Sequence, residues 1–250
     1  MAITRPASTS CVTITPDVSK SYLEDDSLPE RRSMASCVLL PDGKVLCLNG
    51  ARMGVFRASF SCYISLLSLG TGGYGKRSWA IGQSYADDPV LTPVLYDPAA
   101  PAGQRWSSDG FSASTVPRMY HSSALLLADG LPIFYLHLAL HLRTTLLGSI
   151  FVSGSNPNKD YSTGPDVKYP TEYRTERFFP PYYNQRRPQP KGLLSQFSYG
   201  GPIFDVTLDS DDLFGDIKNI ENASVVVLRP GFSTHAMVRH LTFFLILNCL

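Results

Sequence analysis

Two segments of the chain carry side chains that could bind a metal ion. Tyr120 and His121 are adjacent within residues 117–123, where a loop leads into an apolar run. His235 follows a Pro-Gly turn within residues 229–237. Imidazole nitrogen together with phenolate oxygen suits Cu(II), which favours tetragonal N/O sites. Two simpler alternatives remain open: an exposed Tyr beside a partly buried His at the start of a strand, and a loop His capped by hydroxyl groups.

The adjacency of Tyr120 and His121 places a condition on the backbone. In an extended chain, neighbouring side chains point to opposite faces. If both residues bind one metal ion, we therefore expect the backbone to depart from strand geometry at this point. A second His pair, His137 and His141, has the i, i+4 spacing of two ligands on one helix face. No acidic residue lies near that pair and its surroundings are foreign in composition, so we do not expect it to bind a metal.

Hairpins are the elements that must position the Tyr-His pair. Apolar runs flank Pro41-Asp42-Gly43 within residues 39–50, which predicts strand, tight turn, strand, because Pro fixes φ and Gly supplies a positive φ. A similar unit recurs at residues 125–130, but its second strand is delayed until residues 149–156. This repeat predicts propeller blades or a sandwich. Further strands are expected at residues 203–208 and 223–230, the second buried on both faces.

Three segments do not fit their neighbours: residues 55–70, 131–148 and 238–250. Without 131–148 the second hairpin becomes uninterrupted, and without 55–70 a Gly-rich loop becomes continuous. Such consistency is expected of a foldable sequence. We interpret the three segments as translated introns, since codons for Val55 and Val238 begin with GT, as a splice donor does.

Composition limits the class of protein. The chain has 250 residues, of which 44% are hydrophobic and 17% are charged, with a net charge of +1. This balance argues against a nucleic-acid-binding protein and against a charged disordered tail. Gly, Pro and aromatic residues favour β-structure. Residues 131–148 contain Pro132, two His and Arg143, so we do not expect a membrane span. The first residues do not form a signal peptide, which taken literally indicates the cytosol.

The cysteines and acidic clusters predict no further site. The five cysteines show no CxxC pair, which excludes a zinc framework, and the chain is too long for a disulfide scaffold. The odd number leaves at least one thiol unpaired or paired outside the chain, and Cys11 is a candidate half of a disulfide. We expect Asp25-Asp26 and residues 209–212 to lie in solvated loops, and residues 71–75 to be a flexible connection.

Several ordered motifs resemble one enzyme family. RMYHSSALLLADG joined to SIFVSGSNPN, then YPTEYRTERFFPPYY and LRPGFSTHAM, closely resemble the C-terminal half of fungal glyoxal oxidases. These are copper radical oxidases related to galactose oxidase. SLPERRSMASCVLLPDGKVLCLNGA, TGGYG and DPVLTPVLYDP also match. The resemblance runs from about Cys11 to Met237 without the two internal inserts.

The resemblance implies an all-β fold: a kelch-type seven-bladed propeller followed by an immunoglobulin-like, early-set β-sandwich. On this basis residues 1–165 would be the last blades of the propeller, with insertions at about 55–70 and 131–148. Residues 166–250 would be a truncated sandwich. The resemblance also implies an extracellular, monomeric protein.

The resemblance further implies one copper ion held by two Tyr and two His. Tyr120 corresponds to the axial Tyr, which takes the hydroxyl proton of the substrate, and His121 and His235 to the two equatorial His. The family's radical Tyr, cross-linked to a Cys, has no counterpart here, because Cys37 and Cys47 lie in a different motif. We therefore expect the chain to be a fragment that binds copper weakly or not at all and is not a competent oxidase alone.

The activity implied for the parent family is oxidation of small aldehydes to carboxylic acids, with O2 reduced to H2O2. Three alternatives stay open: an alcohol oxidase like galactose oxidase, a non-catalytic kelch-type binding module, and a misannotated fragment with no stable product.

Overall fold

The structure is a computed structural model that describes most of the chain. The described residues are 6–15, 17–54, 62–65, 86–128, 147–158, 160–184, 188, 190–192, 194, 198, 200–222, 225–228, 232–234, 237–239 and 242–245. Within them the chain forms β-strands and two 3-10 helices, η3 (Ser210–Leu213) and η4 (Ile217–Asn222), and no α-helix. The expected all-β class is confirmed.

The first predicted hairpin is present. Strands β3 (Ser36–Leu39) and β4 (Val45–Leu48) pair antiparallel. The turn between them is closed by Gly43, which has φ +80° and donates its N–H to the Leu40 carbonyl at 3.1 Å. Strands β8 (Val94–Tyr96) and β9 (Trp106–Ser107) extend this pair into a four-stranded antiparallel sheet.

The second predicted hairpin is also present. Strand β10 (Ser123–Ala128) pairs antiparallel with β11 (Leu147–Ser155), although residues 129–146 between them lie outside the described part. Strand β12 (Glu172–Phe178) adds to the other edge of β11 and completes a three-stranded sheet. The proposed domain division at residue 165 stays a prediction.

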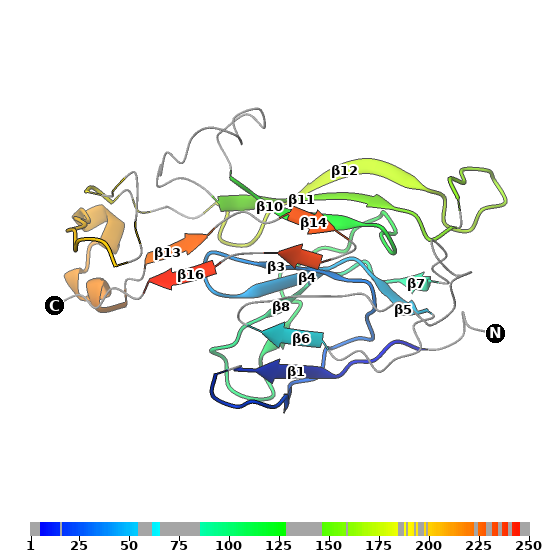
Figure 1. Ribbon diagram of the computed structural model, residues 1–250. Coiled ribbons are helices and arrows are strands. Elements are labelled where there is room, and N and C mark those ends of the chain that lie inside the picture. The colour runs from blue at the N-terminus through cyan, green and yellow to red at the C-terminus, as the bar shows by residue number, and fades with distance from the viewer. Residues whose placement is uncertain are drawn as a thin grey trace.

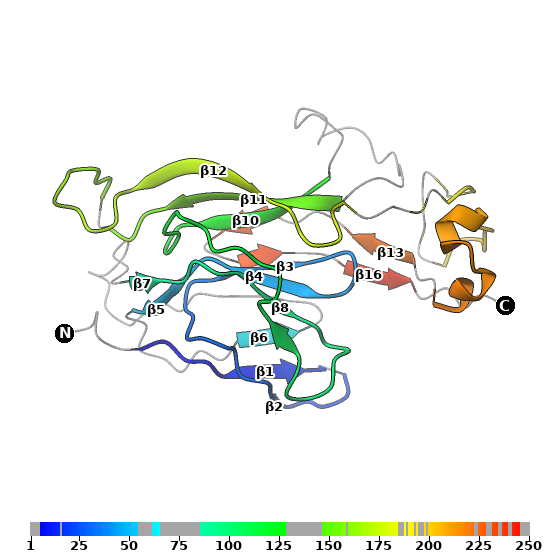
Figure 2. The same cartoon turned by 180° about the vertical axis from the view of Figure 1, so that it is seen from behind.

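A third sheet, in the order β2-β1-β6, contains β1 (Cys11–Ile14), β2 (Leu23–Asp25) and β6 (Cys62–Ser65), with β1 and β6 parallel. The three sheets lie in layers, with β3-β4-β8-β9 between the other two (Figure 1, and from behind in Figure 2). A two-stranded pair, β5 (Ala51–Met53) and β7 (Asp87–Pro89), lies at the end of the middle layer nearer the N-terminus.

Both faces of the middle sheet are buried. One face packs against β10 and β11 in a cluster made of Val38, Leu40, Leu46, Leu48, Ala124, Leu126, Ile150 and Val152, which we call the upper core. The other face packs against β1 in a cluster made of Cys11, Leu28, Ala35, Cys37, Leu39, Val45, Cys47, Val94 and Tyr96, which we call the lower core. The alternation of side chains along β3 and β4 thus supplies two cores from one hairpin.

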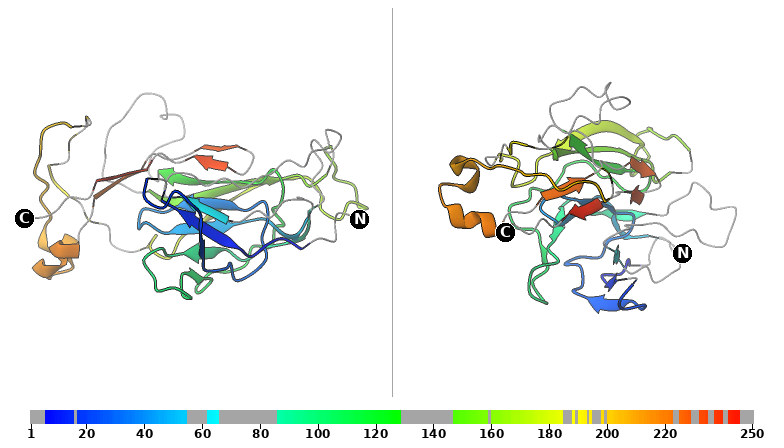
Figure 3. Two further views of the ribbon diagram at one scale, coloured as in Figure 1. Left: turned by 60° about the horizontal axis from the view of Figure 1, so that its bottom comes forward. Right: turned by 60° about the vertical axis from the view of Figure 1, so that its left-hand side comes forward.

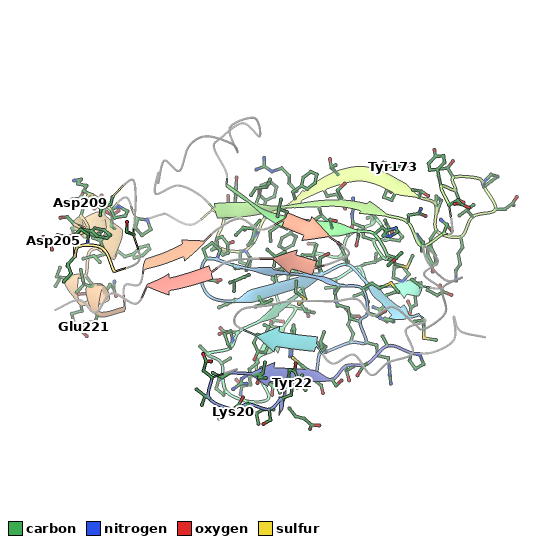
Figure 4. All side chains as sticks on the ribbon, in the orientation of Figure 1. Lys20, Tyr22, Tyr173, Asp205, Asp209 and Glu221 are labelled. Atoms are coloured by element: carbon green, nitrogen blue, oxygen red, sulfur yellow. A yellow bond between two sulfur atoms is a disulfide. The ribbon has the colours of Figure 1, made fainter. Side chains whose placement is uncertain are left out.

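The C-terminal strands form separate pairs. Strand β13 (Val225–Leu228) pairs with β16 (Thr242–Leu245), and β14 (Phe232–Thr234) pairs with β15 (Met237–Arg239). The two 3-10 helices lie beyond β13 and β16, away from the layered sheets (Figure 3). Figure 4 shows Asp205, Asp209 and Glu221 at that end, far from Tyr173 on β12.

Two sequence expectations about this region have different outcomes. A strand is present at residues 225–228, as predicted. The strand predicted at residues 203–208 is wrong: only Thr207 forms a bridge, to Lys191, and Ile203 is 99% exposed. Polar and apolar residues alternate from Phe204 to Leu208, but among the described residues no strand pairs with this segment, and a strand needs a partner for its hydrogen bonds.

The prediction of solvated acidic loops is wrong at Asp25. Its side chain is buried, accepts a hydrogen bond from the Tyr96 hydroxyl at 2.5 Å, and pairs with Arg105. Burial alone would raise the pKa of Asp25, but hydrogen bonds from Tyr96, the Asp26 backbone and Arg105 outweigh it, so the pKa is lowered. Burial and the bond to Asp25 raise the pKa of Tyr96.

A disulfide that the sequence did not reveal joins Cys37 of β3 to Cys47 of β4. The two residues are directly opposite in the hairpin register and both are buried in the lower core. No described helix is long and apolar enough to cross a membrane. The Gly-rich connection at 71–75 lies outside the described residues, as do most of the three segments interpreted as introns.

Candidate metal-binding site

Tyr120 and His121 form a sharp bend just before β10. His121 has φ +61°, in the left-handed region, which non-glycine residues rarely adopt. The two rings are stacked, with centroids 3.9 Å apart and planes inclined by 31°. Tyr120 is half-buried and His121 is exposed. The departure from strand geometry that a shared metal would require is therefore present, and the phenol and the imidazole lie side by side.

The end of β4 supports this bend from one side. The Gly50 N–H donates to the Arg118 carbonyl at 2.7 Å, and the Asn49 amide donates to the Ser122 hydroxyl at 3.2 Å. Ser122 in turn donates to the Met119 carbonyl at 2.7 Å. The Asn-Gly that ends the first hairpin thus contacts residues on both sides of the Tyr-His pair.

The end of β11 supports the bend from the other side. The Met119 N–H donates to the Ser155 hydroxyl at 2.9 Å, and the Asn156 N–H donates to the Tyr120 carbonyl at 2.7 Å. The residues at the ends of β4 and β11, which are equivalent positions in the two repeated hairpins, therefore hold the same segment, residues 118–122. This explains why a loop residue can keep a strained conformation.

Arg118 anchors the segment to β11 and β12. Its side chain is only 2% exposed. It donates from Nε to Glu176 Oε2 at 2.6 Å, from Nη1 to the Gly154 carbonyl at 2.9 Å and from Nη2 to the Arg174 carbonyl at 2.8 Å. The buried guanidinium therefore has an acceptor for each of its three nitrogens, as burial of a charge requires.

A small apolar cluster lies beneath the Tyr-His pair. Buried side chains of Met34, Ala51, Ala86 and Met119 form it, and Tyr120 and Tyr169 pack against it. The cluster gives the Tyr120 ring an apolar support on the protein side. It also brings Tyr169, which sequence reasoning did not select, into the surroundings of the candidate site.

Tyr169 is fixed by Asp87, at the start of β7. The Tyr169 hydroxyl donates to Asp87 Oδ1 at 2.6 Å, and Lys168 Nζ donates to the same oxygen at 2.7 Å. The hydrogen bonds from Lys168 and Tyr169 lower the pKa of Asp87 to about 2. Burial and the Asp87 bond raise the pKa of Tyr169. The partners are more than eighty residues apart, so no local pattern could have revealed the contact.

His235 lies outside the described residues, between β14 and β15. Strand β14 packs against β10 and strand β15 packs against β3, so these C-terminal strands contact the two sheets that hold the Tyr-His pair (Figure 1). His137 and His141 also lie outside the described part. Among the described residues, no group of three or more His, Cys, Asp or Glu is placed to bind a metal ion. The structure thus brings Tyr120 and His121 together and leaves the place of His235 a prediction.

The chain is similar to known proteins over much of its length. Residues 70–182 match a family model described as "Glyoxal oxidase N-terminus". This chain is similar to glyoxal oxidases. It is 30% identical over 235 residues to "Aldehyde oxidase GLOX1" of Arabidopsis thaliana, covering 91% of the chain and 30% of that protein. It is 31% identical over 177 residues to "Aldehyde oxidase GLOX" of Vitis pseudoreticulata, covering 71% and 25%.

A third relative has a different name. The chain is 34% identical over 193 residues to a "WSC domain-containing protein" of Arthroderma benhamiae, covering 76% of the chain and 15% of that protein. The chain therefore spans less than a third of the length of each of these relatives. The glyoxal oxidase match includes Tyr120 and His121, whereas His235 lies beyond the matched residues.

Proposed function

We propose that this chain is part of a glyoxal oxidase-like enzyme that oxidises small aldehydes to carboxylic acids. The observation that carries the proposal is the stacked Tyr120-His121 pair, held at a left-handed bend inside the segment that matches the glyoxal oxidase family. Both relatives named GLOX are called aldehyde oxidases, which supports an aldehyde as the substrate class.

We propose that Tyr120, His121 and His235 bind one copper ion. The donor set fits, since a phenol and an imidazole whose ring centroids are 3.9 Å apart supply the oxygen and nitrogen ligands that Cu(II) prefers. The exposure of His121 leaves its ring accessible to a metal. Bound copper, together with a protein radical, would supply the two one-electron acceptors that a two-electron oxidation needs.

Tyr120 is proposed to take the proton from a hydroxyl group of the aldehyde hydrate. A phenol beside a cation loses its proton readily, which makes Tyr120 suitable as a base. The apolar cluster under its ring limits its movement and keeps the phenol beside His121. Overall, RCHO, H2O and O2 give RCOOH and H2O2, so the two electrons lost by the hydrate reduce O2.

The residues that carry the family's radical have no counterpart in this chain. Cys37 and Cys47 cannot supply the cross-linked Cys, because they are bonded to each other. We therefore propose that this chain by itself binds copper weakly and does not turn over.

The layered sheets support a blade assignment at the level of architecture. A four-stranded antiparallel sheet packed face to face with its neighbours is the building unit of a propeller, and β3-β4-β8-β9 has that form. We propose the kelch-type propeller and the sandwich on this support together with the sequence resemblance. The Cys37–Cys47 disulfide supports an extracellular location, since disulfides persist in oxidising compartments.

Copper titration tests the ligand assignment. The chain is mixed with Cu(II) in molar excess and followed by electron paramagnetic resonance and visible absorption. We expect a phenolate-to-copper absorption band in the unaltered chain that is lost in Tyr120→Phe and kept in Tyr173→Phe, whose hydroxyl is on an exposed ring. The band should also weaken in His121→Asn and His235→Asn.

Two results would contradict the proposal. If Tyr120→Phe and the unaltered chain give the same spectra, Tyr120 is not a ligand. If the chain with Cu(II) and methylglyoxal produces more H2O2 than Cu(II) and methylglyoxal produce without the chain, the proposal that the chain does not turn over by itself is wrong.

A further inference from the structure

The conformation of His121 is unusual and must be held by its surroundings. A non-glycine residue with φ +61° costs free energy and persists only where neighbouring contacts over-determine it. In this conformation the His121 ring lies on the same side of the backbone as the Tyr120 ring, with the two ring centroids 3.9 Å apart. Contacts that fix φ at His121 therefore help to fix the relative placement of the two side chains.

Two hydrogen bonds from the end of β11 fix the residues just before His121. Ser155 is 3% exposed, and its hydroxyl accepts the Met119 N–H at 2.9 Å. The Asn156 N–H donates to the Tyr120 carbonyl at 2.7 Å. The carbonyl of Tyr120 begins the peptide unit that leads into His121, so this bond orients that peptide directly.

The carbonyl of His121 lies against Gly154. A Cβ added at Gly154 would be 2.8 Å from the His121 oxygen, closer than real Cβ contacts allow. Gly154 also has φ +74°, which favours glycine. The peptide units before and after His121 are thus both defined by consecutive residues of one strand end.

We propose that Gly154, Ser155 and Asn156 are positioning residues that hold Tyr120 and His121 as a preformed ligand pair. This inference deepens the proposed function and rests on it for the identity of the metal. The arrangement of the two rings does not itself require a metal, so it can be measured in its absence.

The first test uses Gly154→Ala with Gly110→Ala as its control. Both glycines have a positive φ, +74° and +77°, but a Cβ at Gly110 meets nothing within 4 Å. Backbone strain is therefore matched, and only Gly154→Ala pushes on the His121 carbonyl. The measurement is the chemical shift of the His121 ring protons in the metal-free chain labelled with ¹³C-histidine, with the resonance assigned from its loss in His121→Asn.

The stacked Tyr120 ring should displace the His121 resonance from its position in an unfolded chain. We expect Gly154→Ala to abolish this displacement and Gly110→Ala to keep it. In the copper titration, Gly154→Ala should raise the Kd for Cu(II) about 10–100-fold, the usual effect of removing an outer-shell partner. Gly110→Ala should leave the Kd unchanged.

The second test uses Ser155→Ala with Ser36→Ala as its control. Both serines are buried, but the Ser36 hydroxyl has no hydrogen-bond partner among the described residues. Ser155→Ala should shift the His121 resonance in the same direction as Gly154→Ala, and Ser155→Thr should restore it by returning a hydroxyl. Ser36→Ala should not change the resonance.

The outcomes separate the two proposals. Unchanged His121 resonances in both Gly154→Ala and Ser155→Ala, in folded chains, would overturn the positioning role whatever the copper result. Resonance changes without any copper signal that depends on Tyr120 would keep the positioning role and overturn the proposed metal. If Gly154→Ala does not fold, the comparison of Ser155→Ala with Ser36→Ala decides whether the end of β11 positions the Tyr-His pair.

Discussion

Arg118 shows how a single side chain links the candidate site to the fold. Its guanidinium is buried and holds a carboxylate on β12 and carbonyls of Gly154 and Arg174, while its own carbonyl accepts from Gly50. Because a planar fork with several donors makes these contacts, a lysine ammonium cannot reproduce them. The residue that precedes Met119 and the Tyr-His pair is therefore a structural anchor between strand ends.

We predict that Arg118→Lys lowers the free energy of unfolding by about 2–3 kcal/mol, since buried acceptors lose their partners. Arg174→Lys is the matched control. Arg174 pairs with Glu172 but its side chain is 70% exposed, so its replacement should change the free energy of unfolding little. The measurement is denaturant unfolding of both variants. Equal losses of unfolding free energy in the two variants would show that the burial of Arg118 contributes nothing to stability.

Asp87 makes the stability of the site surroundings dependent on pH. Its folded-state pKa, about 2, is below the value of an unfolded Asp. The stabilisation is therefore complete above about pH 4 and disappears as the pH falls from 4 towards 2. Because the carboxylate is partly exposed, we expect a contribution of about 1 kcal/mol rather than the full value of the shift.

Asp87→Asn tests this pH dependence. The free energy of unfolding should differ from that of the unaltered chain at pH 6, and the difference should be much smaller at pH 2, close to the folded-state pKa of Asp87. Asp88→Asn, at the neighbouring and more exposed carboxylate, should change the free energy little at either pH. A difference for Asp87→Asn that persists undiminished at pH 2 would contradict the assignment.

At the scale of elements, the β3–β4 hairpin was predictable because its turn is encoded locally. Pro41, Asp42 and Gly43 define the turn, and the turn defines the register. That register already places Cys37 opposite Cys47, so the disulfide could have been predicted from residue spacing. A cross-strand pair separated by ten residues does not show the CxxC spacing of a zinc framework, so only the hairpin register reveals it.

We predict that this disulfide stabilises the chain by about 2–3 kcal/mol, the loop-closure value for a ring of roughly ten residues. The double variant Cys37→Ala/Cys47→Ala should unfold at lower denaturant concentration than the unaltered oxidised chain. A reducing agent should lower the stability of the unaltered chain and leave the double variant unchanged. If the reducing agent affects both equally, the cross-link is not the source of the difference.

Other elements show where local patterns are insufficient. Residues 203–208 have the alternation of a strand, but alternation supplies no partner, and Ile203 is exposed. Asp25 has the surroundings of a loop in sequence, but it is buried by Tyr96 and Arg105, which are 71 and 80 residues away along the chain. The bend at His121 could be inferred from the sequence only if both side chains were assumed to bind one metal ion. The hydrogen bonds from the ends of β4 and β11 that hold this bend could not be inferred, because they depend on the packing of two hairpins.

At the scale of the whole molecule, the candidate site lies where two sheets meet. The upper core joins β3 and β4 to β10 and β11, and the exits of β4 and β11 then converge on residues 118–122. The sequence predicted the two hairpins as copies of one unit. The prediction of propeller blades or a sandwich already implied sheets packed face to face. It could not say which side chains meet between the sheets, because apolar strands of this kind have no local signal that selects their contacts.

A double-mutant cycle tests the contact between the two sheets. Leu46 and Leu126 lie on different sheets in the upper core and are fully buried, so each change to Ala should cost about 2–5 kcal/mol. In the double variant the cluster can relax into the shared space, so the loss should be smaller than the sum by about 0.5–3 kcal/mol. The measurement is denaturant unfolding of both single variants and the double variant.

Leu126→Ala combined with Val94→Ala is the control, because Val94 lies in the lower core on the other face of the middle sheet. These two losses should add to within about 0.5 kcal/mol. Additivity in both cycles would mean that the two hairpins do not share a core. In that case the convergence of their ends on Tyr120 and His121 would have no packing to maintain it, and the ligand pair would not be preformed. Coupling confined to the Leu46–Leu126 cycle would instead tie the geometry of the site to the stacking of the sheets.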